Sequence, residues 1–238
     1  MRSTTGDNWD DIADWWAEEA TTDPAFELDV NPVLDELIAP LGPQVLDLGC
    51  GEGQAMRRHD RWVVGIDLSL RLAHRAAESG RALVADLPDL RALRTDAVDG
   101  AYSVYLLDLI PDHRRFFAET ARVVRDGGGL VAIINHPVYT APGSSPLMDD
   151  DGEVLWRWGA YFGRGWSIEQ GGGRDIRFHH RSVGDLVTTA ATEGWTLESM
   201  IERPLSADTI TRLPGYEGQE QIPRLLGVRW RNRVGGHR

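Results

Sequence analysis

Three glycines alternate with other residues directly after a short apolar segment, in the sequence V-L-D-L-G-C-G-E-G-Q. Gly49, Gly51 and Gly53 have no Cβ, so the backbone can turn sharply there and come into contact with a ligand. Such a turn between a strand and a helix is typical of nucleotide-binding α/β folds. The dinucleotide-binding pattern is G-x-G-x-x-G, but Gln54 stands where its third glycine belongs. The spacing therefore disfavours a nicotinamide cofactor.

Two carboxylates end the next two apolar segments. Asp67 ends WVVGID and Asp86 ends ALVAD. A carboxylate at the carboxyl end of a strand can accept hydrogen bonds from both hydroxyl groups of a ribose. We expect Asp67 to do this and Asp86 to meet the edge of an adenine ring.

Two further side chains could take a proton from a substrate. Asp108 follows the fourth expected strand and His136 follows the fifth, so both should project from the carboxyl edge of the sheet. The unperturbed pKa of histidine, about 6.5, makes His136 the better-matched base. Each also has a structural interpretation, Asp108 as a loop carboxylate and His136 as a partner of the turn before Pro137. No group of His, Cys and Asp has metal-site spacing, so we expect no metal.

The elements that must position these residues alternate along the chain. Expected strands are 44–48, 62–66, 82–86, 100–106, 129–135, 195–201 and 223–230. Expected helices are 9–20, 32–41, 53–60, 69–79, 113–125 and 182–193. The helix over 53–60 would point its N-terminus at the ligand of the glycine turn. The alternation predicts an α/β, Rossmann-like, doubly wound fold with a mostly parallel seven-stranded sheet.

Residues 136–178 interrupt this alternation with proline, glycine and acidic residues. A long segment after the carboxyl end of a strand is more often a functional lid than a passive loop. We therefore expect one domain over 1–238. Its parts are N-terminal helices (9–41), a cofactor-binding core (44–135), a cap insertion after strand five (136–178) and C-terminal elements (182–231).

The composition narrows the classes of partner. The 238 residues carry a formal net charge of −12, and every basic side chain is arginine, which fits a GC-rich bacterial genome. The acidic balance disfavours nucleic-acid binding. The chain has no long apolar run and no secretory signal in its first residues, and its single Cys50 fits a reducing compartment. We expect a cytoplasmic protein without a membrane partner, as a monomer or a homodimer.

The motifs together resemble the class I S-adenosylmethionine-dependent methyltransferases, over roughly residues 9–231. VLDLGCGEGQ is similar to the first motif of that family, and Asp67 and Asp86 to its second and third. DGAYSVYLLDLIPD (99–112) and ARVVRDGGGLVAII (121–134) look like its strand-four and strand-five motifs. The most similar subgroup is the small-molecule enzymes of quinone and secondary-metabolite biosynthesis.

This resemblance implies a set of cofactor contacts. The glycine turn would pass the methionine part of S-adenosylmethionine, with Asp47 near its ammonium group and Cys50 as a small spacer. Asp67 would hold the ribose, and Leu68 would lie beside the adenine. The implied cofactor-binding residues are Asp47, Gly49, Cys50, Gly51, Gly53, Asp67, Leu68, Asp86, Leu87 and Ser103. The product would be S-adenosylhomocysteine.

A second resemblance concerns the acceptor side. The segments N-H-P-V-Y-T-A (135–141), F-H-H-R-S-V-G-D-L (178–186) and I-P-R-L-L-G-V (222–228) are similar to one subset, which usually has Glu where this chain has Asn135. We expect the acceptor to be bound by Trp16, Tyr105, Tyr139, Trp158, Tyr161 and His180. The alternative for His180 and its neighbours is a capping network at a helix start.

The favoured function is methyl transfer to O, N or C of a small, aromatic or apolar metabolite. Alternatives are a cofactor-binding enzyme with a non-methylating step, such as a cyclisation or decarboxylation, and a methyltransferase acting on a macromolecule. The candidate catalytic residues are His136 and Asp108. A base is optional for this chemistry, because alignment alone can supply about 7–11 kcal/mol.

Overall fold

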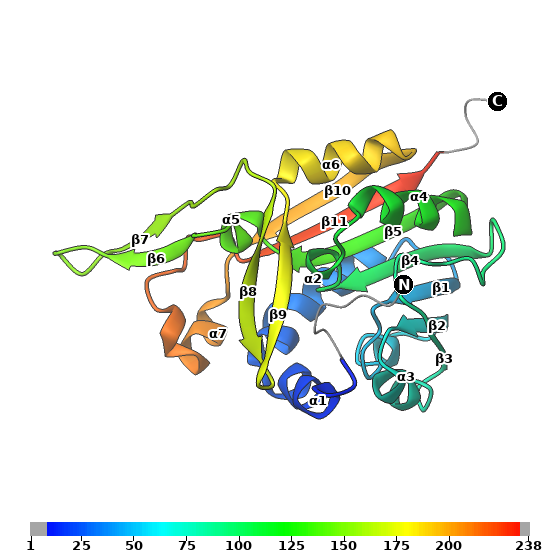
Figure 1. Ribbon diagram of the computed structural model, residues 1–238, viewed down its shortest axis with the longest axis horizontal. Helices are drawn as coiled ribbons and strands as arrows, with labels where there is room; N and C mark the ends of the chain where they lie inside the picture. Colours follow the sequence, from blue (N-terminus) through cyan, green and yellow to red (C-terminus); the bar gives the residue numbers. More distant parts are fainter. Residues whose placement is uncertain (1–8, 234–238) are drawn as a thin grey trace.

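The computed structural model describes residues 9–233, and a seven-stranded sheet forms its centre (Figure 1). The strand order is β10-β11-β5-β4-β1-β2-β3. The strands are β1 (Gln44–Leu48), β2 (Trp62–Asp67), β3 (Arg81–Val84), β4 (Val98–Val104), β5 (Val124–Asn135), β10 (Trp195–Arg203) and β11 (Leu225–Asn232). Strands β1 to β5 are parallel, while β11 is antiparallel to both of its neighbours. The predicted fold class is therefore confirmed.

Helices cover both faces of this sheet. They are α1 (Ala13–Thr22), α2 (Asn31–Ile38), α3 (Leu70–Ala76), α4 (His113–Val123), α5 (Pro137–Thr140), α6 (Val183–Thr192) and α7 (Ala207–Arg212). Shorter helical turns are the π-helix η1 (Phe26–Val30) and the 3₁₀-helices η2 (Met56–Arg58), η3 (Leu107–Leu109) and η4 (Pro214–Tyr216). Within the described chain, no helix is long and apolar enough to cross a membrane.

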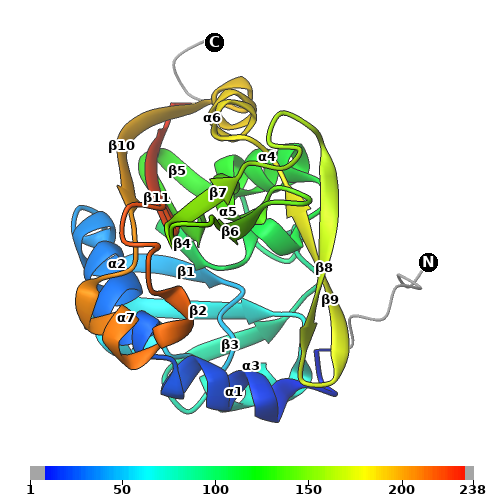
Figure 2. The same ribbon diagram turned by 90° about the vertical axis from the view of Figure 1, so that its left-hand side faces the viewer.

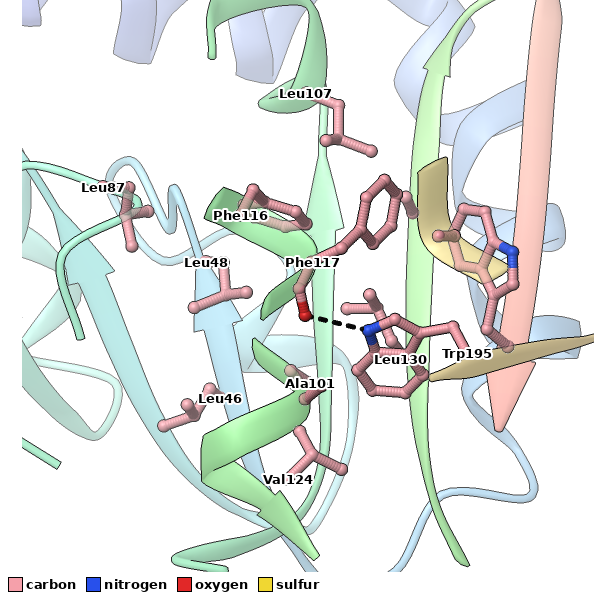
Figure 3. Packing of buried hydrophobic residues seen from close by; sticks show 14 of the residues in the cluster. Leu46, Leu48, Leu87, Ala101, Leu107, Phe116, Phe117, Val124, Leu130 and Trp195 are labelled. Atoms are coloured by element: carbon pink, nitrogen blue, oxygen red, sulfur yellow. Dashed lines mark hydrogen bonds between the residues drawn. The ribbon is translucent and has the colours of Figure 1, made fainter. Parts of the chain in front are cut away.

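Apolar side chains on both faces fix the sheet between these helices. On one face, Phe116 and Phe117 of α4 pack toward Leu48 and Leu130 of the sheet (Figure 3). The indole of Trp195, also in this cluster, donates a hydrogen bond from Nε1 to the Phe117 carbonyl oxygen at 3.0 Å. Because these strands are buried on both faces, they contain few polar residues before their carboxyl ends.

The opposite face is covered by α2. Val33, Leu34 and Leu37 pack in one buried cluster with Val131 and Ile133 of β5. The π-helix η1 ends at Val30 and α2 begins at Asn31, so no loop separates these two elements. This arrangement places α1 and η1 beside the carboxyl ends of the central strands (Figure 2).

The prediction of a helix over 53–60 is wrong. Only the short η2 forms there, and turns precede it. Gly51 and Gly53 have φ of +53° and +90°, left-handed values that cannot belong to an α-helix. The glycine turn therefore extends farther along the chain than the sequence indicates.

The cap contains more regular structure than its sequence predicts. Helix α5 is followed by the hairpin β6 (Ser145–Met148) and β7 (Val154–Arg157) and by the hairpin β8 (Gly165–Gly171) and β9 (Arg174–His180). The first hairpin extends away from the sheet in Figure 1. The second runs along the carboxyl edge as far as α1, as Figure 2 shows.

Candidate active site

The glycine turn after β1 forms the floor of the candidate site. Its three glycines have left-handed φ values, +74° at Gly49, +53° at Gly51 and +90° at Gly53. The Gly49 amide donates to the carbonyl oxygen of Ile66 at 2.8 Å, which holds the turn against β2. A Cβ on Gly49 would come within 2.9 Å of the Leu106 side chain. Only glycine therefore fits this backbone, and the missing Cβ lets a ligand come into contact with the turn.

Asp67 at the end of β2 is fixed by backbone amides. Its Oδ2 accepts a hydrogen bond from the Gly51 amide and its Oδ1 from the Ser69 amide, both at 2.8 Å. Burial raises the pKa of Asp67, while these hydrogen bonds act to lower it. Each carboxylate oxygen keeps a lone pair, so Asp67 can accept the two hydroxyl protons of a ribose.

Two buried polar groups beside the turn have atoms without a protein partner. Asp47 Oδ2 in β1 and Ser103 Oγ in β4 form no hydrogen bond. Burial raises the pKa of Asp47 to about 8, the nearby Tyr102 hydroxyl acts to lower it, and the charge of Asp67 raises it further. A ligand ammonium group would lower this pKa and pair with the carboxylate. The groups that should hold the methionine part of S-adenosylmethionine are thus present.

Helix α1 covers the glycine turn. The indole Nε1 of Trp16 would lie 3.2 Å from a Cβ built on Gly51. Trp16 and Phe26 line, with the turn, a cavity of about 40 Å³. Small-molecule sites usually measure about 300–1,000 Å³, so α1 must move when a cofactor enters.

The adenine side of the site is open. Asp86, after β3, has an exposed side chain, and Leu68 is 45% exposed, whereas Leu87 is buried. These residues flank the carboxyl ends of β2 and β3, where the resemblance predicts the adenine. The exposed apolar side chain of Leu68 and the exposed carboxylate of Asp86 suit an adenine ring that enters from solvent.

Asp108, in η3 after β4, is a buried carboxyl with one free oxygen. It is 4% exposed, and its Oδ2 has no hydrogen-bond partner. Burial raises the pKa of Asp108 to about 7, while hydrogen bonds from Asn135 and the charge of Arg224 act to lower it. A carboxylate that exchanges its proton near neutral pH suits a general base.

His136 is buried after β5, and both of its ring nitrogens have partners. Its Nδ1 accepts from the Val138 amide at 3.1 Å, so the proton is on Nε2, which donates to Glu202 Oε1 at 2.8 Å. Burial lowers the pKa of His136, although Glu202 acts to raise it. In this arrangement the neutral imidazole has no lone pair left for a substrate proton.

The predicted acceptor residues lie in separate groups. Trp16 and Tyr105 both pack edge-on against Phe26, with ring centroids 6.5 and 5.5 Å away. They therefore lie beside the cofactor turn. Tyr139 stacks on Trp156 at 4.7 Å on the cap side of the sheet edge.

The remaining predicted acceptor residues form a cluster at the start of α6. The Nε2 of His180 is 2.8 Å from the Tyr161 carbonyl oxygen, and the Tyr161 hydroxyl accepts from the Val183 amide at 3.3 Å. Trp158 packs on Tyr161 but is 58% exposed. These contacts link the cap to α6, and they do not bring this cluster into contact with Tyr105.

Sequence reasoning missed Arg224, the residue before β11. Its main chain pairs with the residue after β5, because the His136 amide donates to the Arg224 carbonyl oxygen at 2.8 Å. Its guanidinium binds Asn135 Oδ1. The only sequence signal is the arginine in I-P-R-L-L-G-V, and its significance depends on β11 lying next to β5. Over residues 9–233, no three acidic, histidine or cysteine side chains gather as metal ligands would.

Comparisons with known sequences support the interpretation of the glycine turn as part of a binding site for S-adenosylmethionine. A family model described as a methyltransferase domain matches residues 46–132. The chain is 34% identical over 134 residues to the ubiquinone biosynthesis O-methyltransferase of Hahella chejuensis, covering 49% of this chain and 54% of that protein. It is 33% identical over 105 residues to the phosphatidylethanolamine N-methyltransferase of Cereibacter sphaeroides, covering 40% and 51%. The chain thus spans about half the length of the curated relatives it matches.

Solved structures match over more of the chain. An S-adenosylmethionine-dependent methyltransferase from Mesorhizobium loti has a TM-score of 0.74 and 28% identity, covering 84% of this chain and 96% of that one. A structure from Listeria monocytogenes has a TM-score of 0.73 and 25% identity, covering 87% and 99%. Residues 46–132 are thus similar to a methyltransferase domain, and the described chain has the fold of these S-adenosylmethionine-dependent methyltransferases. These matches imply S-adenosylmethionine as the cofactor, as the sequence predicts.

Proposed function

We propose that this chain transfers a methyl group from S-adenosylmethionine to a hydroxyl oxygen of a small, aromatic or apolar molecule. The observation that carries the proposal is the position of Asp108. It is a buried carboxyl with a free Oδ2 and a pKa near 7, at the strand edge that also carries the glycine turn. A base is needed when the acceptor is a hydroxyl, because the attacking oxygen must lose its proton.

The residues around the turn bind and orient the reactants. When bound, S-adenosylmethionine supplies an electrophilic methyl group on a cationic sulfur. Asp47 pairs with its ammonium group and Asp67 with its ribose, so the methyl group is held in line with the acceptor. Phe26 and Trp16 close over the turn and exclude water. As the oxygen–carbon bond forms and the carbon–sulfur bond breaks, the hydroxyl proton goes to Asp108.

We assign the proton to Asp108 rather than to His136. The Nδ1 lone pair of His136 already accepts from the Val138 amide, and its Nε2 proton is directed at Glu202. We assign His136 a positioning role, since its contacts connect the end of β5 with β10. Alignment of the reactants supplies the remaining rate enhancement, as it does for acceptors that need no base.

The ubiquinone biosynthesis O-methyltransferase supports an oxygen acceptor. Of the two curated relatives named above, one is an O-methyltransferase and the other an N-methyltransferase. The fold alone leaves other chemistry open, because a [4+2]-cyclase has it too, at a TM-score of 0.55 and 17% identity. The net charge of −12 disfavours a nucleic-acid acceptor.

Calorimetry and product analysis test the proposal. We expect S-adenosylmethionine and S-adenosylhomocysteine to bind with a micromolar Kd, about −8 kcal/mol. With a hydroxylated aromatic acceptor, S-adenosylhomocysteine and the methyl ether should form in equal amounts. Tight binding of NADH without binding of S-adenosylmethionine would refute the assignment. A product formed without S-adenosylhomocysteine would identify a non-methylating enzyme.

A further inference from the structure

Arg224 is surrounded by aromatic rings at the carboxyl edge of the sheet. Its Cζ lies 4.1 Å from the ring centroid of Tyr139. The Tyr216 hydroxyl and the Tyr105 ring also lie close to the guanidinium. One N–H group donates to Asn135 Oδ1. A cation on an aromatic face is stabilised, but these neutral partners leave its charge uncompensated.

The lack of a direct carboxylate contact distinguishes Arg224 from the arginines of the following strand, β11. Arg229 and Arg231 of β11 both bind Glu198, at the far end of the sheet edge. Over residues 9–233, by contrast, Arg224 takes part in no ion pair. The chain has 37 acidic and 25 basic residues, so carboxylates are not scarce. An enclosed guanidinium without one costs desolvation free energy that a bound anion would offset.

This guanidinium lies near the candidate base, and Tyr105 lies between it and the cofactor turn. The side chains of Arg224, Tyr105 and Tyr139 are each partly exposed, so solvent reaches the space between them. The charge of Arg224 acts on Asp108, whose Oδ2 is free. Tyr105 connects this space with the turn, because its ring packs on Phe26. A molecule bound to Arg224 would thus lie within the proposed acceptor pocket.

The chemistry of one guanidinium favours one class of anion. Its planar fork of N–H donors matches the two oxygens of a carboxylate. A phosphate dianion carries more charge than a single arginine balances, and it is usually held by several cations or a helix N-terminus. The flat rings of Tyr105, Tyr139 and Tyr216 suit an aromatic body attached to that carboxylate.

We propose that Arg224, oriented by Asn135, is a carboxylate-binding residue of the acceptor pocket, and that the acceptor is a small hydroxylated aromatic acid. This inference rests on the proposed function, since it names the acceptor class of the same site. The carboxylate binds Arg224, and the hydroxyl group is held toward Asp108. Two fixed points orient the acceptor better than aromatic packing alone.

Paired ligands test this subsite in the intact chain. The probes are hydroxybenzoate and hydroxyphenylacetate, each compared with its neutral amide, with S-adenosylhomocysteine at saturation. Calorimetry should show that at least one acid binds about ten- to hundredfold more tightly than its amide. R224Q should remove this preference. N135E should also remove it, because the new carboxylate would pair with the guanidinium.

Arg203→Gln is the matched control. Arg203 lies one strand away on β10, is exposed, and its carbonyl oxygen accepts from the Arg224 amide. Its loss removes the same charge from the same edge, so the preference for acids should persist. If R203Q loses the preference for acids as R224Q does, the preference arises from the total positive charge at this edge of the sheet. Arg224 would then form no carboxylate subsite.

Further outcomes separate this inference from the proposed function. Equal binding of acids and amides to the wild type, or no binding of any acid, would overturn the subsite. Tighter binding of phenyl phosphate than of hydroxybenzoate would overturn the carboxylate assignment. S-Adenosylhomocysteine affinity, measured first, should be the same in the wild type, R224Q and N135E. If the wild type does not bind S-adenosylhomocysteine, the proposed function is refuted instead. If R224Q fails to fold, N135E carries the test, because it keeps the arginine.

Discussion

Two carboxylates at one edge of the sheet differ because of their hydrogen bonds. Asp67 accepts two backbone amides at 2.8 Å, which stabilise its charged form. Asp108 is more deeply buried, and its Oδ2 has no partner, so its pKa rises to about 7. The first arrangement suits a fixed charge that binds hydroxyl groups. The second suits a group that gains and loses a proton.

Asp67→Ala should weaken cofactor binding much more than it lowers stability. Charge-assisted hydrogen bonds contribute about 1.5–3 kcal/mol each, so loss of the two bonds to the ribose should raise Kd for S-adenosylhomocysteine about 10²–10⁴-fold. Calorimetry with the deoxyribose analogue identifies the cause, because the analogue should lose affinity for the wild type but not for the variant. Asp60→Ala, at an exposed position, is the control. An unchanged Kd in D67A would show that Asp67 does not hold the ribose.

Asp108→Asn should remove the pH dependence of turnover on its acidic side. The wild-type base must be ionised, so kcat/KM should fall as the pH drops through about 7, the raised pKa of Asp108. Loss of a general base typically lowers the rate by about 10²–10⁴. The affinity for S-adenosylhomocysteine should not change. If D108N keeps its turnover and the same acidic limb, alignment alone drives catalysis and another group titrates.

Residue types show which groups can do chemistry, but not which of their atoms are free. The sequence placed Asp108 and His136 at the ends of adjacent strands, and both lie there. Their difference comes from neighbours that are remote in sequence, such as Glu202, which pairs with His136. Arg224 could not be selected at all, since its lack of an ion pair depends on strand order.

At the scale of elements, α1 and the β8–β9 hairpin form one cover over the site. Gly171 and Gly172 of the hairpin turn lie against Trp15 and Ile12. Asp14 of α1 binds Arg71 and Arg75 of α3, and Arg174 of β9 binds Asp11. All of these ion pairs are exposed to solvent and screened, so they stabilise little. These ion pairs therefore add little to the free energy needed to open the cover.

Hydrogen exchange should show that this cover closes on ligands. With S-adenosylhomocysteine and an aromatic acceptor bound, amides of Ala13–Thr22 and Gly165–His180 should become more protected. The physical reason is that Trp16 must leave Gly51 to admit the cofactor and then pack on it. The β6–β7 hairpin, which extends away from the sheet, is the internal control. Protection confined to 45–54 and 82–87 would mean that the cover is purely structural.

The elements differ in how well the sequence predicts them. The core strands were predicted to within a few residues, because continuous apolar runs are typical of a parallel sheet. The helix over 53–60 was wrong, since left-handed glycines continue the turn. The cap hairpins were not predicted because β6 and β8 pair only with their partners, and half-exposed strands between glycines have no clear apolar alternation.

At the scale of the whole molecule, buried titratable groups connect the site with stability. Asp47 and Asp108 both have raised pKa values, so each favours the protonated folded state. His113 is buried with its Nε2 2.8 Å from the Leu107 carbonyl oxygen, and burial lowers its pKa to about 4. The carboxyl groups therefore cost stability as the pH rises, and His113 costs stability as the pH falls below about 6.5. These two pH ranges overlap between about pH 4 and 6.5, where two carboxyl groups oppose one histidine, so the net contribution of the three groups to stability falls as the pH rises.

Asp108→Asn should therefore stabilise the cofactor-free chain at neutral pH while it lowers activity. The pKa of Asp108 is about 7 in the folded chain and near 3.8 in the unfolded chain. Below pH 3.8 both states hold the proton, and the wild type has its full stability. Between pH 4 and 7 only the unfolded state releases the proton, which favours unfolding by up to about 4 kcal/mol. The amide in D108N avoids this loss, although Arg224 and Glu169 still act on the site.

The measurement is Tm against pH for the wild type and D108N. Each kcal/mol corresponds to about 2–4 °C for a chain of this size, so the variant should gain several °C by pH 7 and almost nothing at pH 4. The effect of His113 is common to both proteins and cancels in the difference. Asp60→Asn, at an exposed position, should show a Tm difference that does not change with pH. A constant difference for D108N would mean that Asp108 is ionised in the folded chain throughout this range, and it would remove the reason for assigning it the acceptor's proton.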